Sequence, residues 1–318
     1  MPSASRIDTH QHVLPPEYRS WLESKSQTPG GVPLPTWGAS STIQLMDDLD
    51  VATAIVSVSA PGVHLDPAVT GADAVARSWA RKVNEFAAEL VKDHPDRFGF
   101  FATLTLPDVE GAIAEAEYAF DVLGADGVIL LANAHGTYLG DATFDPLFDA
   151  LNERAATIFV HPTELPGPTA AGVPSFAADF LLDTTRAAIK LAMSGTLDRC
   201  GRLKIILSHG GGFLPYAAYR FAPLCAPDFT VESGIASLRR FYFDTTAASS
   251  PSALPSLLAF ADPSHITFGT DWPWMPRGSI TGFTGWLDRL DVDDDQLHAI
   301  NRGNAEVLFP RLANGSKA

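Results

Sequence analysis

The sequence predicts an α/β protein, a single-domain (β/α)8 barrel of the TIM type with long loops on its C-terminal face. Short apolar runs alternate with longer amphipathic runs along all 318 residues, a pattern typical of repeated strand–helix units. Eight such apolar runs occur, which is the number of strands in this barrel. Residues 1–318 contain no internal repeat, low-complexity tract or linker, so we expect one domain.

The eight predicted strands are short runs rich in Val, Ile, Leu and Phe. They lack polar alternation, as expected for parallel strands that are covered on both faces. They span residues 7–13, 53–57, 98–104, 127–131, 157–161, 203–208, 241–245 and 266–270.

Helices with one apolar face are predicted between the strands. In the segment 72–92 the apolar residues recur at steps of three or four and form one stripe: Val75, Trp79, Val83, Phe86 and Leu90. Similar patterns predict helices at residues 108–123, 144–154, 180–194 and 252–260. Two connections are long and rich in Pro and Gly, from residue 14 to about 40 and from 163 to 178. Loops of this size inside a compact domain usually have a function.

Composition and charge exclude several classes of protein. With 46% hydrophobic and 19% charged residues, the chain is a globular protein and not a disordered one. No apolar run approaches the ~20 residues that span a bilayer, and the N-terminus does not resemble a secretory signal, so we expect a cytoplasmic protein. The net charge of −15 argues against nucleic acid and anionic membranes as partners. The net charge does not exclude a small carboxylate as substrate.

Histidine and aspartate follow four of the predicted strands. His10 and His12 end the first strand, where residues i and i+2 point to the same side, and His161, His209 and Asp271 end the fifth, sixth and eighth. All five side chains should meet at the C-terminal face. Imidazole and carboxylate suit Zn, Mn or Fe, and three or four ligands with one open position form a catalytic arrangement. The two cysteines form no CxxC motif, which leaves nitrogen and oxygen ligands.

Each of these signals is weak alone. A histidine of the HxH pair can be an ordinary core residue, and Asp271 can be a helix N-cap before Trp-Pro. Their joint placement at the ends of four strands is what predicts a divalent metal site. The predicted strand 127–131 has no Lys that could be carbamylated to bridge two metals, so we expect one ion. Gly210 to Gly212 lack the Lys and Ser/Thr of a phosphate-binding loop, and no organic cofactor is expected.

Motifs along nearly the whole chain resemble the amidohydrolase-2 group of the amidohydrolase superfamily, which includes aminocarboxymuconate semialdehyde, γ-resorcylate and 6-methylsalicylate decarboxylases. The combination of SHGGG with GTDWP is specific to this group. The motifs are IDTHQH at 7–12, DRFGFFATLTLPD at 96–108, LGADGVILLAN at 123–133, FVHP at 159–162, SHGGGFLPY at 208–216, FYFDT at 241–245, FGTDWPW at 268–274 and GNAEVLF at 303–309.

The resemblance implies roles for particular residues. The positions that match the metal ligands are His10, His12, His161 and Asp271. This donor set favours Zn2+, with Mn2+ as the alternative. His209 matches a histidine beside the metal that contacts its water or the substrate. Arg220 matches an arginine that binds the substrate carboxylate, in the semialdehyde decarboxylase from the neighbouring subunit, and relatives imply a homodimer or a dimer of dimers.

Further candidates rest on position and residue type. Four aromatic residues could stack on a substrate ring: Phe176, Trp272, Trp274 and Tyr138. His64 and His135 follow the second and fourth strands on the active-site face and could line the pocket. Asp244 ends the seventh strand, where it could support His209 or be a buried hydrogen-bonded group. Residues 37–43 lack the arginine with which the semialdehyde decarboxylase binds its substrate, which favours a salicylate-type relative.

Three functions are compatible with this site. The favoured one is non-oxidative decarboxylation of a small aromatic or enol carboxylic acid. The resemblance to salicylate-type decarboxylases implies that Asp271 protonates the ring carbon. It also implies that His209 stabilises or deprotonates the phenolic oxygen or, in a semialdehyde-type mechanism, the metal-bound water. The alternative is hydrolysis of a substrate such as a lactone, with a metal-bound water whose pKa falls toward ~7 and His209 or Asp271 as base. The third is a metal-binding protein without catalysis.

Overall fold

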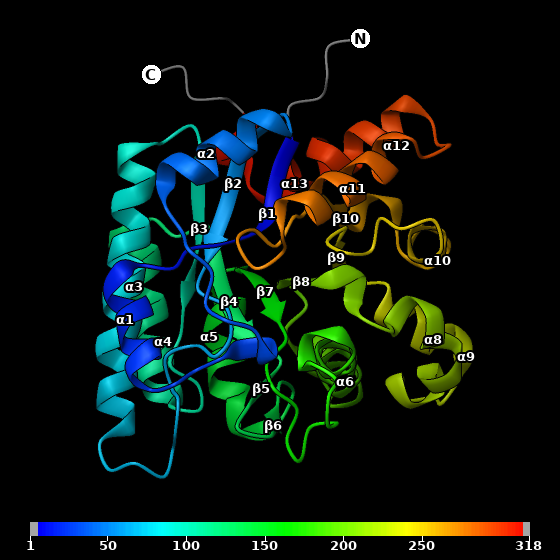
Figure 1. Ribbon diagram of the computed structural model, residues 1–318. Coiled ribbons are helices and arrows are strands. Elements are labelled where there is room, and N and C mark those ends of the chain that lie inside the picture. Colours follow the sequence, from blue (N-terminus) through cyan, green and yellow to red (C-terminus); the bar gives the residue numbers. More distant parts are fainter. Residues whose placement is uncertain (1–5, 314–318) are drawn as a thin grey trace.

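The computed structural model describes residues 6–313, in which eight parallel strands form a nearly closed barrel with helices around it (Figure 1). The prediction about the N-terminal segment falls partly on residues 1–5, outside this range. The strands follow the order β1-β2-β3-β4-β7-β8-β9-β10. Their bounds are β1 Arg6–His12, β2 Val51–Ser57, β3 Phe98–Thr103, β4 Gly127–Leu131, β7 Thr157–His161, β8 Lys204–Leu207, β9 Tyr242–Asp244 and β10 Ile266–Thr267.

The eighth strand is shorter than predicted, but the chain after it continues beside β1 and closes the barrel. Single bridges join Asp8 to Phe268 and Gln11 to Trp272. Across this seam the Thr9 N–H donates to the Phe268 carbonyl at 2.9 Å, and the His12 N–H to the Trp272 carbonyl at 2.7 Å. The predicted (β/α)8 barrel is confirmed, with its first and last strands joined by an irregular seam.

Helices cover the outside of the barrel, with α3, α4 and α5 on one side and α6, α8 and α10 on the other (Figure 1). The five predicted helices are present, although the one at 108–123 ends in a π-helical turn, Ala119–Leu123. No bounds were predicted for the remaining helices. Two of them, α1 and α2, lie in the long connection between β1 and β2. The bounds are α1 Pro16–Ser24, α2 Ala39–Asp48, α3 Ala72–Asp93, α4 Val109–Tyr118, α5 Asp145–Glu153, α6 Asp179–Met193, α7 Thr196–Arg199, α8 Leu214–Phe221, α9 Val231–Leu238, α10 Ala253–Phe260, α11 Arg277–Asp288, α12 Asp294–His298, α13 Asn304–Leu308 and α14 Pro310–Ala313. Among the described helices, none combines the length and the apolar character needed to cross a bilayer.

A core of large apolar side chains fills the barrel beneath the active-site face. Its members come from seven of the strands and from the C-terminal segment that includes α13 and α14: Ile7, Ile55, Phe101, Ile129, Phe159, Ile206, Tyr242, Ala305, Phe309 and Leu312. The Phe101 ring stacks on Phe159 at 5.5 Å between centroids and lies 5.8 Å from Phe309. Phe159 in turn lies 4.8 Å from the His10 ring. Aromatic packing therefore runs from the C-terminal helices up to the first candidate ligand.

The substitution Phe101→Ala should remove the centre of this core. A buried Phe→Ala change costs about 3–5 kcal/mol because it combines lost transfer free energy with a cavity, and urea unfolding of the purified variant measures it. The control is Val122→Ala, because Val122 is 64% exposed and such surface changes stay within about 0.5 kcal/mol. Equal unfolding midpoints for the two variants would contradict the assignment of Phe101 to the core.

Candidate metal centre

Four side chains converge at the C-terminal face of the barrel: His10, His12, His161 and Asp271, with one ligand atom of each within 4.8 Å of the others. His10 and His12 come from β1, His161 from the end of β7 and Asp271 from the segment after β10. The three histidines are buried and the side chain of Asp271 is 14% exposed. Alternation along β1 brings His10 and His12 to the same side, as expected from their i, i+2 spacing.

Each of the three imidazoles is held through its Nδ1 atom. His10 Nδ1 lies 2.6 Å from an Asp244 carboxylate oxygen, His12 Nδ1 lies 3.2 Å from the Ser57 carbonyl, and His161 Nδ1 lies 2.8 Å from the Pro162 carbonyl. Carbonyl and carboxylate oxygens only accept, so the Nδ1–H groups donate. In its neutral form, each ring then has a lone pair on Nε2, and this is the form that binds a metal.

The four ligand atoms lie close to one another. His12 Nε2 lies 3.1 Å from His10 Nε2 and 3.1 Å from Asp271 Oδ1, and His161 Nε2 is buried and has no hydrogen-bond partner among the described residues. Donors about 2.0–2.1 Å from a tetrahedral ion are roughly 3.3 Å apart, so this spacing fits one divalent ion. Lone pairs that converge in a buried site need such a cation, and the residues present fit the metal that the sequence predicts.

Electrostatics favours the metal-binding forms of His161 and Asp271, which are the neutral imidazole and the ionised carboxylate. Burial lowers the pKa of His161 well below its ordinary value, and the nearby histidines lower it further. Burial would raise the pKa of Asp271, but hydrogen bonds from His10 and His12 hold it well below the usual range. Burial would lower the pKa of His10, yet Asp244 and Asp271 outweigh it and raise the pKa to about 10. The cluster thus attracts a positive charge, which either a proton or a divalent ion supplies.

Asp244, at the end of β9, supports His10. Its Oδ1 accepts the Thr246 N–H at 3.0 Å, while Oδ2 accepts from His10 Nδ1. This corrects the suggestion that Asp244 supports His209. The contact depends on a close approach at Gly269, where a Cβ atom would lie 2.9 Å from the His10 Cβ and 3.2 Å from the Asp244 Cβ. Any larger residue at 269 would push these two side chains apart.

His209 stands beside the ligand cluster and outside it. Its Nε2 lies 3.4 Å from Asp271 Oδ2, and its Nδ1 is buried and has no hydrogen-bond partner in the described part of the chain. Both His209 and Asp271 have positive φ, 54° and 62°, a conformation that non-glycine residues rarely adopt and that clusters at functional sites. His209 is therefore an imidazole positioned to exchange protons with the carboxylate.

A cavity of about 570 Å3 opens above the cluster. His161, His209 and Asp271 lie at its floor. Its walls are mainly apolar and come from the loops after β1, β7 and β10 and from the helices α6 and α11: Pro29, Val32, Pro33, Pro35, Phe176, Phe180, Leu181, Trp274, Met275 and Phe283. Among the described residues, those that line it include neither Lys nor Arg. A bound molecule therefore meets charge at the floor and hydrocarbon elsewhere.

The four ring-stacking candidates have different positions. Phe176 and Trp274 line the cavity, whereas Trp272 and Tyr138 do not. Trp272 follows Asp271 with the alternation of a strand, so its ring faces outward, where its Nε1–H donates to Thr42 Oγ1 of α2 at 3.1 Å.

The other two substrate-binding candidates lie away from this cavity. His135 lines a separate cavity, described below. Arg220 is exposed on α8 and is not among the lining residues of this chain. Contact of Arg220 with a substrate would have to come from another copy of the chain, so this role stays a prediction.

Glu164 is a residue that the sequence did not single out. Its Oε1 accepts the Gly30 N–H at 2.9 Å and the Ser175 hydroxyl at 2.9 Å. Glu164 thereby joins the long loop after β1 to the long loop after β7, and Gly30 lies in the cavity wall. Nothing in the local sequence marks this carboxylate, because its partners are far away along the chain.

Metal content should separate the ligands from His209. His161→Ala or Asp271→Ala removes one of the four converging donors, so stoichiometric metal should be lost after dialysis. His209→Ala leaves the four donors in place and should retain one ion per chain. Elemental analysis of the three purified variants measures this, with circular dichroism as the folding control. A metal-free His209→Ala protein that is folded would make His209 a ligand.

Comparison with known proteins agrees with this geometry. The amidohydrolase family model Amidohydro_2 matches residues 7–311. A 6-methylsalicylic acid decarboxylase from Penicillium expansum is 37% identical over 319 residues, with 97% of each chain covered, and the decarboxylase macB from Penicillium terrestre is 35% identical, with 97% of this chain and 96% of the relative covered. The crystal structure of an amidohydrolase II matches with a TM-score of 0.90 at 28% identity, covering 96% of this chain and 100% of the other. The chain belongs to the amidohydrolase family.

Proposed function

We propose that this chain is a metal-dependent, non-oxidative decarboxylase of a 2-hydroxybenzoate with an apolar ring substituent. The observation that carries the proposal is a four-donor metal site at the floor of a cavity whose walls are mainly apolar and whose lining, among the described residues, includes neither Lys nor Arg. Relatives at 35–37% identity over nearly the whole chain are named decarboxylases, two of them for 6-methylsalicylic acid.

The cavity selects the substrate by its charge distribution. Bound by His10, His12, His161 and Asp271, a divalent ion supplies Lewis acidity and a fixed positive charge at the floor. The carboxylate and the ortho-hydroxyl group of the substrate therefore belong at this end. Phe176, Phe180 and Trp274 enclose the ring, and aromatic side chains pack well against another ring. A second carboxylate on the far side would be buried without a partner, which is costly.

His209 and Asp271 carry the proton. His209 takes the phenolic proton and passes it from Nε2 to Asp271 Oδ2, 3.4 Å away. Asp271 then protonates the ring carbon that bears the carboxylate, and the phenolate oxygen supplies the electrons for the new C–H bond. The C–C bond breaks next, its electron pair returns the ring to an aromatic phenolate, CO2 leaves, and the phenolate takes up a proton from water to give the phenol. The low pKa of Asp271 means that the carboxyl donates only a proton that it has just received.

The test is a CO2-release screen with metal-loaded protein. We expect 6-methylsalicylate to yield CO2 and 3-methylphenol in equal amounts, and hydroxybenzoates with a second carboxylate to react at least about tenfold more slowly, because a charge would enter the apolar wall. The variant His209→Ala should retain metal and lose about 100-fold or more of kcat, as expected for a lost acid–base group. Opening of lactones without CO2 release from any hydroxybenzoate would make the chain a hydrolase instead.

The ion and the assembly are further parts of the proposal. A donor set of three imidazoles and one carboxylate favours Zn2+ over Mn2+. A homodimer is supported by an exposed aromatic surface on α8, where Tyr216 and Tyr219 are 86% and 67% exposed beside Arg220, because such surfaces mark interaction sites. We also place the protein in the cytoplasm, which the free cysteines Cys200 and Cys225 support.

Complementation tests whether Arg220 acts across a dimer. Arg220→Ala and His209→Ala should each be inactive alone. In a mixed dimer, the site that retains His209 receives the intact Arg220 of the other subunit, so random exchange should restore about one quarter of wild-type activity in a symmetric dimer. Native mass spectrometry verifies the exchange. No recovery in verified mixed dimers would exclude a role in trans.

A further inference from the structure

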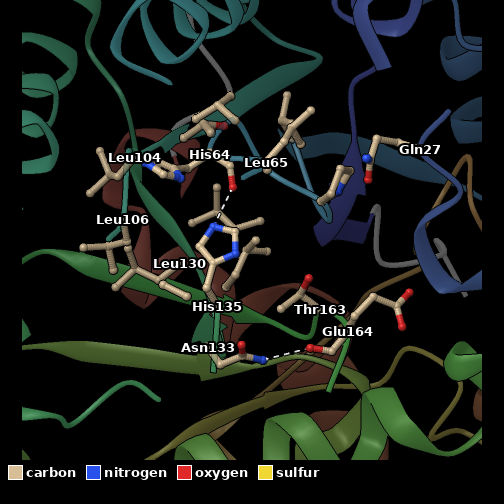
Figure 2. Close-up of a pocket in the computed structure, with 18 residues that line it drawn as sticks. Gln27, His64, Leu65, Leu104, Leu106, Leu130, Asn133, His135, Thr163 and Glu164 are labelled. Carbon is tan, nitrogen blue, oxygen red and sulfur yellow. Dashed lines mark hydrogen bonds between the residues drawn. The ribbon is translucent and has the colours of Figure 1, made fainter. Parts of the chain in front are cut away.

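A second cavity, of about 210 Å3, lies beside the metal cavity at the C-terminal ends of β2, β3 and β4. Figure 2 shows Leu104, Leu106 and Leu130 on one side of it and Gln27, Thr163 and Glu164 on the other, with His64 and His135 between them. The cavity contains none of the metal ligands, and the mechanism above uses none of its residues. An apolar cavity of roughly 150 Å3 is large enough for benzene, so this one has room for a single substituted ring.

His64 lines this cavity and has an unused hydrogen-bonding atom. Its side chain is 3% exposed, and its Nε2 lies 2.8 Å from a carboxylate oxygen of Asp73. Its other nitrogen, Nδ1, is buried and has no hydrogen-bond partner among the residues that the structure describes. A buried polar atom without a partner costs about 1–3 kcal/mol, and a ligand hydroxyl in the cavity would satisfy it.

His135 presents a second polar edge. Its Nε2–H donates to the His64 carbonyl at 2.9 Å (Figure 2), which leaves a lone pair on Nδ1. Burial lowers the pKa of His135, which favours the neutral ring. Its φ of +51° is rare for a residue with a side chain, and such strain is typical of functional positions. The two imidazoles lie 5.4 Å apart between centroids.

The charges around the cavity select against anions. Among the described lining residues there is neither Lys nor Arg, and Glu164 contributes a negative charge. A carboxylate placed here would be buried without a cation, which is strongly unfavourable. A phenol is neutral, and its hydroxyl can both donate and accept, so it suits either protonation form of His64.

We propose that this second cavity binds a neutral single-ring phenol, with its hydroxyl on His64 Nδ1 and its ring against the leucines. The identification of this phenol as the product of this chain rests on the proposed function. The cavity and the unpartnered Nδ1 atom of His64 are independent of the proposed function. Only a thin wall separates the two cavities: Ser59 and Ala60 line the metal cavity, whereas Pro61 and Gly62 line the second. The structure thus offers a place where product and carboxylate substrate are distinguished by charge.

The test follows imidazole signals in zinc-loaded protein with 13C-labelled histidine. Addition of 3-methylphenol should shift the signals of His64 and His135 saturably. The signal lost in His64→Phe is assigned to His64, and the signal lost in His135→Phe is assigned to His135. Benzoate, an anion without an ortho-hydroxyl group, should leave both signals in place. The substitution Leu65→Trp should fill the cavity and abolish the shifts, while Val122→Trp, on the exposed surface, keeps them.

The variant His64→Phe tests the proposed hydrogen bond between the phenol hydroxyl and His64 Nδ1, and the signal of His135 then reports binding. Affinity for 3-methylphenol should fall about fivefold, to that for toluene, which matches the loss of about 1 kcal/mol for one hydrogen bond. If Leu65→Trp does not fold, Leu106→Phe takes its place. Unshifted His64 and His135 signals, which would mean that the cavity holds water only, would overturn the proposal, as would equal binding of benzoate. Phenol binding without CO2 release in the substrate screen would overturn the proposed function and leave this site standing.

Discussion

The lone pairs of three imidazole nitrogens and one carboxylate oxygen converge on one buried point, and much of the surrounding structure holds them in place. Such a group of acceptors repels itself unless a cation binds, so its geometry must be imposed by neighbours. Asp244, the Ser57 carbonyl and the Pro162 carbonyl fix the three rings from behind. Beneath them, the ring of Phe159 packs against His10 and extends the barrel core to the metal site.

The loops add a separate constraint above this centre. Glu164 joins the loop after β1 to the loop after β7. The two loops that form much of the wall of the metal cavity are therefore connected to each other. The same residue lines the second cavity. The floor supplies charge and the wall supplies apolar surface, which together define the kind of molecule that fits.

The strands and the ligand cluster could be predicted from the sequence because both depend on local patterns. An apolar run marks a parallel strand covered on both faces, and the His10–His12 spacing places both rings on one side wherever the strand lies. The two helices after β1 were not predicted, since Pro and Gly dominate that segment. The sequence offered four aromatic candidates for the cavity without separating them. Phe176 and Trp274 line it and Trp272 does not, because the placement of the loops on the closed barrel decides which rings reach the cavity.

The partners of Asp244 and Glu164 were out of reach for a similar reason. Asp244 contacts His10 across 234 residues of sequence, and Glu164 contacts Gly30 across 134. Contacts of this kind follow from the closed barrel and from loop packing. His135 was expected on the active-site face, and it does lie there, but β4 places it in the neighbouring cavity.

The seam between β1 and the segment after β10 has one more consequence. His10 and His12 stand on one side of it and Asp271 on the other, and the Asp271 N–H donates to the His10 carbonyl at 2.8 Å. An ion held by these residues is therefore a cross-link between nearly opposite ends of the chain, comparable to a disulfide that closes a very long loop. Cross-links of this type restrict the unfolded chain most when the loop is long. The ion that takes part in the reaction would thus also stabilise the closed barrel against unfolding.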